Sequence, residues 1–172
     1  MSKYLFDSSV FVQAKNLYYQ FGFCGGFWDW VIAGHEKNMF FSCRKVHAEL
    51  TVAKDGDDAK EWAKGLPSSF FVNDIDDPAV MAVYANVMQW AHGSTHYLPA
   101  AKAEFAGAKE ADAFLLSVAK AHGYSIVTQE KPNPAKRNRV PLPDAAEAFS
   151  VDTIFIYDLL AKHALPTFKL NA

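Results

Sequence analysis

Four acidic residues occupy positions where a sheet protein could bring their carboxylates to one metal ion. Asp7 directly follows a short apolar run, and Glu130 follows another. Glu49 belongs to a predicted helix after a third such run, and Asp112 opens a long apolar helix. In an open parallel sheet the chain leaves the strands along one edge, where such folds bind ligands. Carboxylates gathered there repel one another unless a cation holds them, so the sequence predicts a divalent-metal site.

The chemistry of such a site follows from its oxygen ligands. Mg²⁺ and Mn²⁺ are hard cations that prefer carboxylate oxygen and water. A common use of these ions is phosphodiester hydrolysis, in which no side-chain nucleophile is required. Each acid alone has a simpler explanation: Asp112 as a first-turn acid favoured by the helix dipole, Glu49 as a solvated helix residue, and Asp7 and Glu130 as turn residues. Their joint placement favours the metal site.

The elements that would position these acids alternate between strand and helix. Predicted strands are residues 4–6, 38–42, 69–72, 125–128 and 151–154. Predicted helices are residues 8–19, a segment through Trp28 to Ile32, a segment from Val46 to Ala53, a short helix through Trp62, and residues 78–90, 111–122 and 155–163. This alternation predicts an α/β fold, a three-layer α/β/α sandwich around a central, mainly parallel sheet. The length favours one domain over residues 1–172.

Capping residues mark several helix ends. Serine and aspartate are good N-caps, proline suits the first helical turn, and glycine often follows the last one. The expected caps are Ser8 or Ser9, Ser42, Asp57 or Asp58, and Asp77 before Pro78, with Gly93 and Gly123 as helix ends.

Composition narrows the functional classes. The net charge is −2, from 17 basic and 19 acidic residues, so any nucleic-acid-binding surface must be local. Cys24 and Cys43 form neither a disulfide framework nor a metal-binding spacing. No apolar stretch approaches the ~20 residues that span a bilayer, and the N-terminus has no signal-peptide pattern. We therefore expect a cytoplasmic protein without a membrane anchor.

One loop provides a local excess of positive charge. Residues 131–139 contain four basic residues and no acid, and they directly follow Glu130. Lys136, Arg137 and Arg139 could contact substrate phosphates beside the metal. The alternative is a solvated loop that proline keeps open. The sequence leaves both interpretations open.

Other candidate residues have weaker support. His92 and His96 have a spacing that zinc could use, but no local Cys or acid completes the set. Phe27, Trp28 and Trp30 could stack on bases, although such aromatic clusters are more often part of a core.

Taken in order, the motifs resemble those of the PIN domain, a metal-dependent nuclease fold, and most closely a prokaryotic PIN-like branch. The resemblance covers nearly the whole chain. The matching stretches are Tyr4 to Phe11, Gln13 to Tyr19, Gly26 to Trp30, Val46 to Leu50, Ala111 to Leu115, Ile126 to Glu130 and Pro143 to Phe149.

The resemblance implies roles for individual residues. Asp7, Glu49 and Asp112 would be the core metal ligands and Glu130 the fourth acid, while Ser8 and Thr128 would be hydroxyl neighbours that orient ligands or a water. The wider family often carries Asn where this chain has Ser9, and Asp where it has Glu130. The implied reaction is RNA hydrolysis that leaves a 5′-phosphate and a 3′-hydroxyl.

Three functions are open from the sequence. The first is a Mg²⁺- or Mn²⁺-dependent ribonuclease, the toxin of a toxin–antitoxin pair; an antitoxin partner and a homodimer are both compatible with it. The second is a non-catalytic PIN-like binding module for nucleic acid or protein, which only Ser9 favours. The third is an aspartyl-phosphate phosphotransfer domain using Asp7, which is disfavoured because Ser9 stands where those enzymes need a second Asp.

Overall fold

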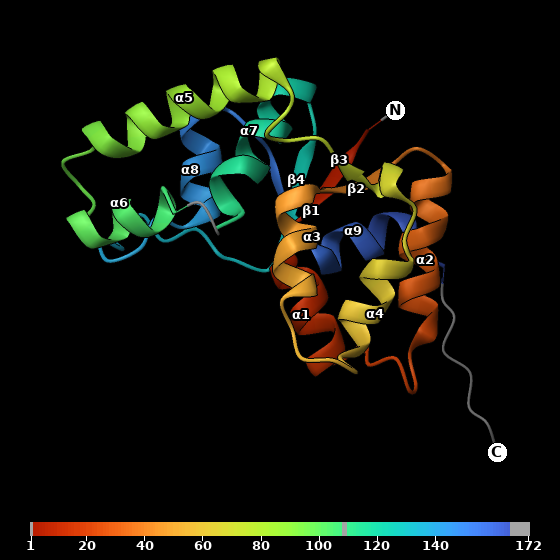
Figure 1. Cartoon of the computed structure of the whole chain (residues 1–172). Helices are drawn as coiled ribbons and strands as arrows, with labels where there is room; N and C mark the ends of the chain where they lie inside the picture. The colour runs from red at the N-terminus through yellow and green to blue at the C-terminus, as the bar shows by residue number, and fades with distance from the viewer. Residues whose placement is uncertain (1, 108–109, 166–172) are drawn as a thin grey trace.

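The computed structural model describes residues 2–107 and 110–165 of the chain. Its sheet has five strands in the order β3-β2-β1-β4-β5, and every neighbouring pair is parallel. The strands are β1 (Tyr4–Phe6), β2 (Phe40–Cys43), β3 (Phe71–Val72), β4 (Ser125–Thr128) and β5 (Thr153–Phe155). Helices flank this sheet, so the predicted three-layer α/β/α class is confirmed (Figure 1).

Most helices of the described residues lie to one side or the other of the sheet in Figure 1, with α1 and α3 between them. In Figure 1, α5, α6, α7 and α8 lie on the left of the sheet, and α2, α4 and α9 lie on the right. Their bounds are α1 (Ser8–Asn16), α2 (Gly25–Glu36), α3 (Arg44–Thr51), α4 (Asp58–Gly65), α5 (Pro78–Gly93), α6 (Pro99–Phe105), α7 (Asp112–His122), α8 (Leu142–Ala148) and α9 (Ile156–His163), with a 3₁₀ turn at Ser68–Phe70.

The first strand of the chain is the central strand of the sheet. All three residues of β1 are buried, because helices cover both faces of a parallel sheet and leave no side for polar residues. Leu5 pairs with Phe41 on one side and with Ile126 on the other. The amide of Asp7 donates to the Val127 carbonyl at 2.9 Å, which extends the pairing by one residue. The ends of β1 and β4 therefore reach the same edge, called here the carboxyl edge.

Helix α2 approaches β2 closely at a glycine. A Cβ on Gly34 would lie 1.9 Å from a ring carbon of Phe40, far inside contact distance. Phe40 is itself buried, so its ring has no free space into which to move. Glycine at this position lets the helix lie against the strand.

Strand predictions are confirmed in full for β1 and β4 and in part for the others. The strand predicted at 38–42 runs from Phe40 to Cys43, and the one predicted at 151–154 runs from Thr153 to Phe155. The segment 69–72 begins as a 3₁₀ turn and contributes two strand residues. The bounds differ by at most two residues at each end, which is the usual uncertainty of element ends.

Two predicted caps are wrong. The cap of α1 is Asp7 and not Ser8 or Ser9, and the cap of α3 is Cys43 and not Ser42, whose hydroxyl donates instead to the Phe6 carbonyl at 2.7 Å.

Other helix ends are confirmed. Asp57 and Asp77 accept from amides of the next turn, and Gly123 ends α7 in the left-handed conformation. Helix α1 stops at Asn16, before the predicted end, and α6 was not predicted.

None of the helices in the described ranges is both long and apolar enough to cross a membrane.

Candidate metal centre at the carboxyl edge of the sheet

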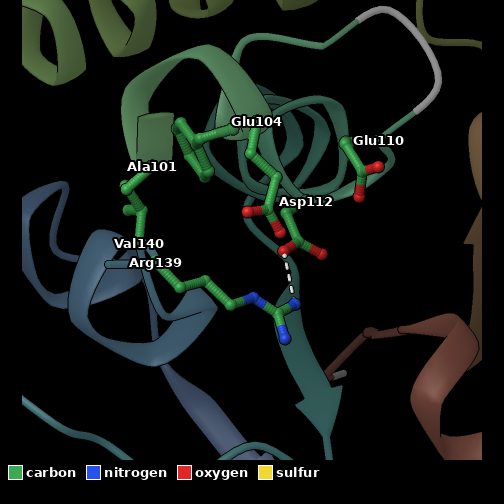
Figure 2. A pocket seen from close by; sticks show the side chains of 7 residues that line it. Ala101, Glu104, Glu110, Asp112, Arg139 and Val140 are labelled. Atoms are coloured by element: carbon green, nitrogen blue, oxygen red, sulfur yellow. Dashed lines mark hydrogen bonds and ion pairs between the residues drawn. The ribbon is translucent and has the colours of Figure 1, made fainter. Parts of the chain in front are cut away.

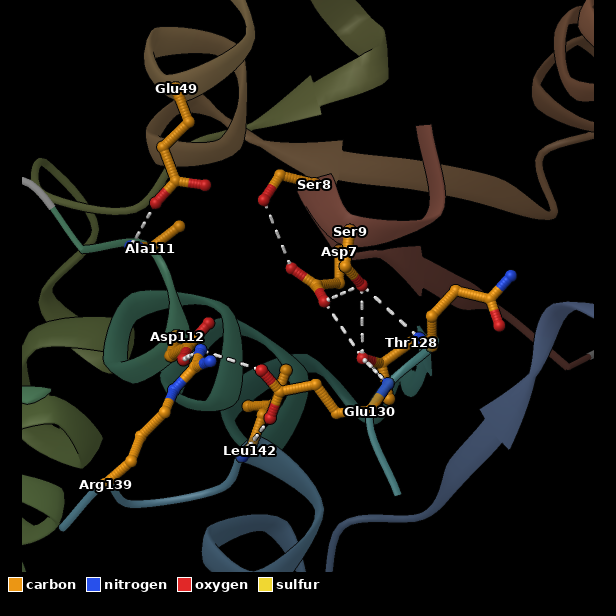
Figure 3. Close-up of polar contacts among 11 residues, drawn as sticks. Asp7, Ser8, Ser9, Glu49, Ala111, Asp112, Thr128, Glu130, Arg139 and Leu142 are labelled. Carbon is orange, nitrogen blue, oxygen red and sulfur yellow. Dashed lines mark hydrogen bonds and ion pairs between the residues drawn. The ribbon is translucent and has the colours of Figure 1, made fainter. Parts of the chain in front are cut away.

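Asp7 is the most deeply placed acid of the site. Its side chain is 3% exposed, and three hydroxyl groups surround it (Figure 3). Thr128 donates to Oδ2 at 2.9 Å, Ser9 also donates to Oδ2, and Ser8 lies 3.5 Å from Oδ1. The carboxylate accepts no capping hydrogen bond from the backbone amides of α1. Its orientation is therefore fixed by β4 and by the serines that follow it.

Glu49 reaches the site from α3. Val46 and Leu50 of this helix are buried in the core, which turns the neighbouring Glu49 toward the start of α7. Its Oε1 accepts from the Ala111 amide at 2.8 Å. Burial raises the pKa of Glu49, whereas hydrogen bonds from Ser8 and from that amide lower it. A carboxylate at a helix start is favoured by the helix dipole, so this contact also supports α7.

Asp112 and Glu130 are joined by one guanidinium group. Arg139 Nη2 lies 2.7 Å from Glu130 Oε1 and 3.4 Å from Asp112 Oδ2. The other oxygen of Glu130 accepts from the Leu142 amide at 3.1 Å, at the start of α8. Glu130 thus anchors the end of the basic loop, and both of its oxygens have partners (Figure 3).

The charges of the site act on one another. The pKa of Asp112 is raised to about 8, first by burial and then by the charges of Asp7 and Glu130, while Arg139 opposes the shift. Glu49 adds a smaller effect in the same direction as the other acids. Four ionised carboxylates would carry four negative charges, of which one guanidinium offsets one. The site therefore favours either a proton or a further cation.

The donor set fits a hard divalent ion. All four acids supply carboxylate oxygen, the ligand type that Mg²⁺ and Mn²⁺ prefer. Within residues 2–107 and 110–165, however, no three His, Cys, Asp or Glu side chains are already gathered as a metal-binding group. In the structure the carboxylate oxygens instead accept from Ser9, Thr128, Arg139 and two backbone amides. Some of these hydrogen-bond partners would have to move before an ion could bind the carboxylates. The roles of the four acids as metal ligands stay predictions.

The three basic residues predicted to bind substrate separate into two groups. Arg139 contacts the acids of the site, as described above. Arg137 is exposed and donates through Nε to the His96 carbonyl at 3.0 Å. The Lys136 carbonyl accepts from His96 Nε2 at 2.9 Å. His96 therefore holds the basic loop against the segment that joins α5 to α6.

Three contributors to the site went unpredicted. Ser9 was noted only as a departure from the usual Asn, but its hydroxyl binds Asp7 and accepts from the Gln129 amide at 3.3 Å. Glu104 and Glu110 line a small hollow together with Asp112 and Arg139 (Figure 2). Glu110 follows Gly107 closely in sequence and Glu104 lies on the unpredicted α6, so no local pattern marked either of them.

The weaker candidates lie outside the site. Phe27 and Trp28 are buried core residues, as the core interpretation predicts. The aromatic Trp30 is partly buried and packs edge-on against Phe40. Asp144, an acid in the first turn of α8, accepts from the Asn133 amide at 2.8 Å and so ties the basic loop to that helix.

The fold and the site define an α/β protein with an acidic cluster at the carboxyl edge of a parallel sheet. The model of one family, described as a domain of unknown function (DUF4411), matches residues 4–167. That match covers most of the 172 residues, so the chain belongs to this family. A search of curated proteins finds no match.

Proposed function

We propose that this protein is a divalent-metal-dependent ribonuclease that hydrolyses phosphodiester bonds of RNA. The observation that carries the proposal is the convergence of Asp7, Glu49, Asp112 and Glu130 from four separate segments onto one edge. Structural acids are usually spread over the surface, and clustering raises the cost of ionising them. Such clustering is typical of functional sites.

The proposed roles divide between holding an ion and orienting its ligands. Asp7, Glu49 and Asp112 would hold Mg²⁺ or Mn²⁺, with Glu130 as the fourth acid. When bound, such an ion supplies activation of water and stabilisation of negative charge on the phosphate. Thr128 and Ser9 fix the Asp7 carboxylate by hydrogen bonds, and the carboxylate caps no backbone amide of α1.

The position of the basic loop supports a polyanionic substrate. Lys136 and Arg137 lie in the loop that Glu130 begins, and Arg139 touches the acids directly. A single RNA strand lying across the edge could meet these cations while one of its phosphates faces the carboxylates. The resemblance to PIN domains, which is part of this proposal, adds a biological role: the toxin of a toxin–antitoxin pair acting in the cytoplasm, with an antitoxin protein as its partner.

The direct test is cleavage of single-stranded RNA by purified protein with Mg²⁺ or Mn²⁺. We expect EDTA to abolish cleavage, and we expect D7N and D112N each to remove it. Asp158→Asn is a matched control, because Asp158 is an exposed acid in the first turn of α9. Cleavage at the wild-type rate in both D7N and D112N would exclude this site as its source.

The alternative is a PIN-like module that binds nucleic acid or protein without cleaving RNA. The observation in its favour is that the oxygens of the acids already have protein partners, including Arg139. RNA binding by the wild-type protein without any metal-dependent cleavage would support that alternative.

A small DNA-binding protein encoded by the adjacent reading frame would support the toxin role.

A further inference from the structure

Arg139 occupies a position between two carboxylates that come from different elements. It lies in the segment between β4 and α8, and its Nη2 contacts Glu130 at 2.7 Å and Asp112 at 3.4 Å. The same segment is fixed a few residues later by the hydrogen bond from the Leu142 amide to Glu130. Val140, next to Arg139, is buried. The backbone that carries Arg139 is therefore anchored, and any movement of the guanidinium has to come from its side chain.

The Arg139 side chain is more exposed to solvent than the side chains of Asp112 and Glu130, which it contacts. The Arg139 side chain is 41% exposed, whereas Asp112 is 17% exposed and Glu130 is 22% exposed. Figure 2 shows the Arg139 side chain extending toward Asp112 in the hollow that Glu104 and Glu110 also line. Rotation of a long side chain toward solvent needs no opening of the core. Arg139 can leave the carboxylates while the carboxylates stay in place.

Charge explains why Arg139 is there. Burial alone would lower the pKa of Arg139, but the charges of Glu130 and Asp112 raise it above its ordinary value. In return, Arg139 lowers the otherwise raised pKa of Asp112. The guanidinium thus reduces repulsion among the acids, which is also what a bound ion would do.

We propose that Arg139 is an internal cation of the site that competes with a divalent ion for Asp112 and Glu130. A guanidinium and a divalent ion repel each other at these distances, and both need the same carboxylate oxygens. Arg139 therefore leaves the carboxylates when an ion binds, and the freed side chain becomes available to a substrate phosphate. This inference rests on the metal site of the proposed function. The Arg139 side chain would then have two states: paired with Asp112 and Glu130 when no ion is bound, and in contact with a substrate phosphate when an ion is bound.

The experiment measures Mn²⁺ affinity by calorimetry, without RNA, for wild type, R139Q, R139K and R137Q. We expect R139Q to bind Mn²⁺ about tenfold tighter than wild type, a factor that corresponds to about 1.4 kcal/mol. R139K keeps the charge but loses the planar fork that spans two carboxylates, so its affinity should fall between the two. R137Q is the matched control, because Arg137 belongs to the same loop and contacts a backbone carbonyl instead. Its Mn²⁺ affinity should equal that of wild type.

The outcomes separate this inference from the proposed function. If Arg139 only holds the carboxylates in position, R139Q binds Mn²⁺ more weakly than wild type, and the inference is overturned while the metal site stands. Equal affinity in R139Q and wild type also overturns the inference. If R139Q does not fold, as judged by circular dichroism, R139K carries the same comparison. Absence of Mn²⁺ binding in every variant overturns the proposed function and this inference together.

Discussion

Replacing Asp112 by Asn should stabilise the metal-free protein, and the gain should grow with pH. Asp112 is 17% exposed and lies among other acids, and its pKa in the folded protein is raised from 3.8 to about 8. A raised pKa means that the folded state holds a proton which the unfolded state releases at lower pH. The stability contributed by that proton is fully present below pH 3.8 and is lost as the pH rises through about 8.

The size of the effect follows from the shift. One pH unit between the two pKa values corresponds to about 1.4 kcal/mol, so the upper limit of the loss is about 1.6 kcal/mol near pH 5 and about 5 kcal/mol near pH 7.5. Asn avoids this loss but gives up the charged contact with Arg139, which lies 3.4 Å away. We therefore expect the advantage of D112N over wild type to increase by about 2 kcal/mol between those two pH values. For a chain of this size that corresponds to roughly 4–8 °C in Tm.

Thermal and urea unfolding of both proteins in EDTA, at several pH values, measures this difference. Asp158→Asn serves as the control, because Asp158 is an exposed first-turn acid and should show no such pH-dependent gain. Saturating Mg²⁺ should stabilise wild type more than D112N, since a bound ion relieves the same repulsion. The reasoning is refuted if D112N is the less stable protein at every pH in EDTA, or if its advantage does not change with pH.

Two further predictions concern the basic loop and the packing of α2. Replacing Lys136 and Arg137 by Ala should weaken binding of single-stranded RNA, measured by fluorescence titration, and lower the slope of log affinity against log salt by roughly 0.7 for each lost phosphate contact. The Mn²⁺ affinity should not change. An unchanged slope would mean that the loop is a solvated connection without phosphate contacts. Gly34→Ala should cost about 2–4 kcal/mol in urea unfolding, because its Cβ would lie 1.9 Å from the Phe40 ring, while Gly93→Ala, with open space around its Cβ, should be neutral or stabilising.

The parts of the fold that the sequence predicted well depend on strong local patterns. β1 and β4 are apolar runs that end at polar residues, so their bounds and the positions of Asp7 and Thr128 could be predicted. Helix α6 was missed because it is short, and its start at Pro99 is preceded by an apolar residue rather than by a capping side chain. The cap of α1 differs from the prediction because the Ser9 hydroxyl is used elsewhere: it donates to the Asp7 carboxylate and accepts from the Gln129 amide after β4.

The sequence could indicate that the four acids lie near one another, but it could not indicate the contacts of Arg139, and the metal-ligand roles stay predictions. Asp7 and Glu130 come after strands and Asp112 starts a helix, so their sequence positions place them near one edge. Glu49 lies late in α3, the helix that follows β2. The partners of Arg139 depend on how the loop returns from β4 to α8, which is decided by contacts between residues far apart in sequence. An arginine in a basic loop is normally expected to face solvent or substrate. Its attachment to Asp112 and Glu130 had no local signal.

The central place of β1 in the sheet has a consequence for synthesis of the chain. Asp7 and Glu49 leave the ribosome well before β4, the neighbour of β1 that begins at Ser125. Until that strand emerges, β1 can pair only with β2, and neither Thr128 nor Glu130 is present to complete the edge. Segments of a domain can fold in the order in which they are synthesised, but the central part of this sheet cannot form until β4 is available to pair with β1. If the protein is the ribonuclease proposed above, a nascent chain is expected to stay inactive until β4 and Glu130 have been made, so the ribosome that produces it is not exposed to an active nuclease.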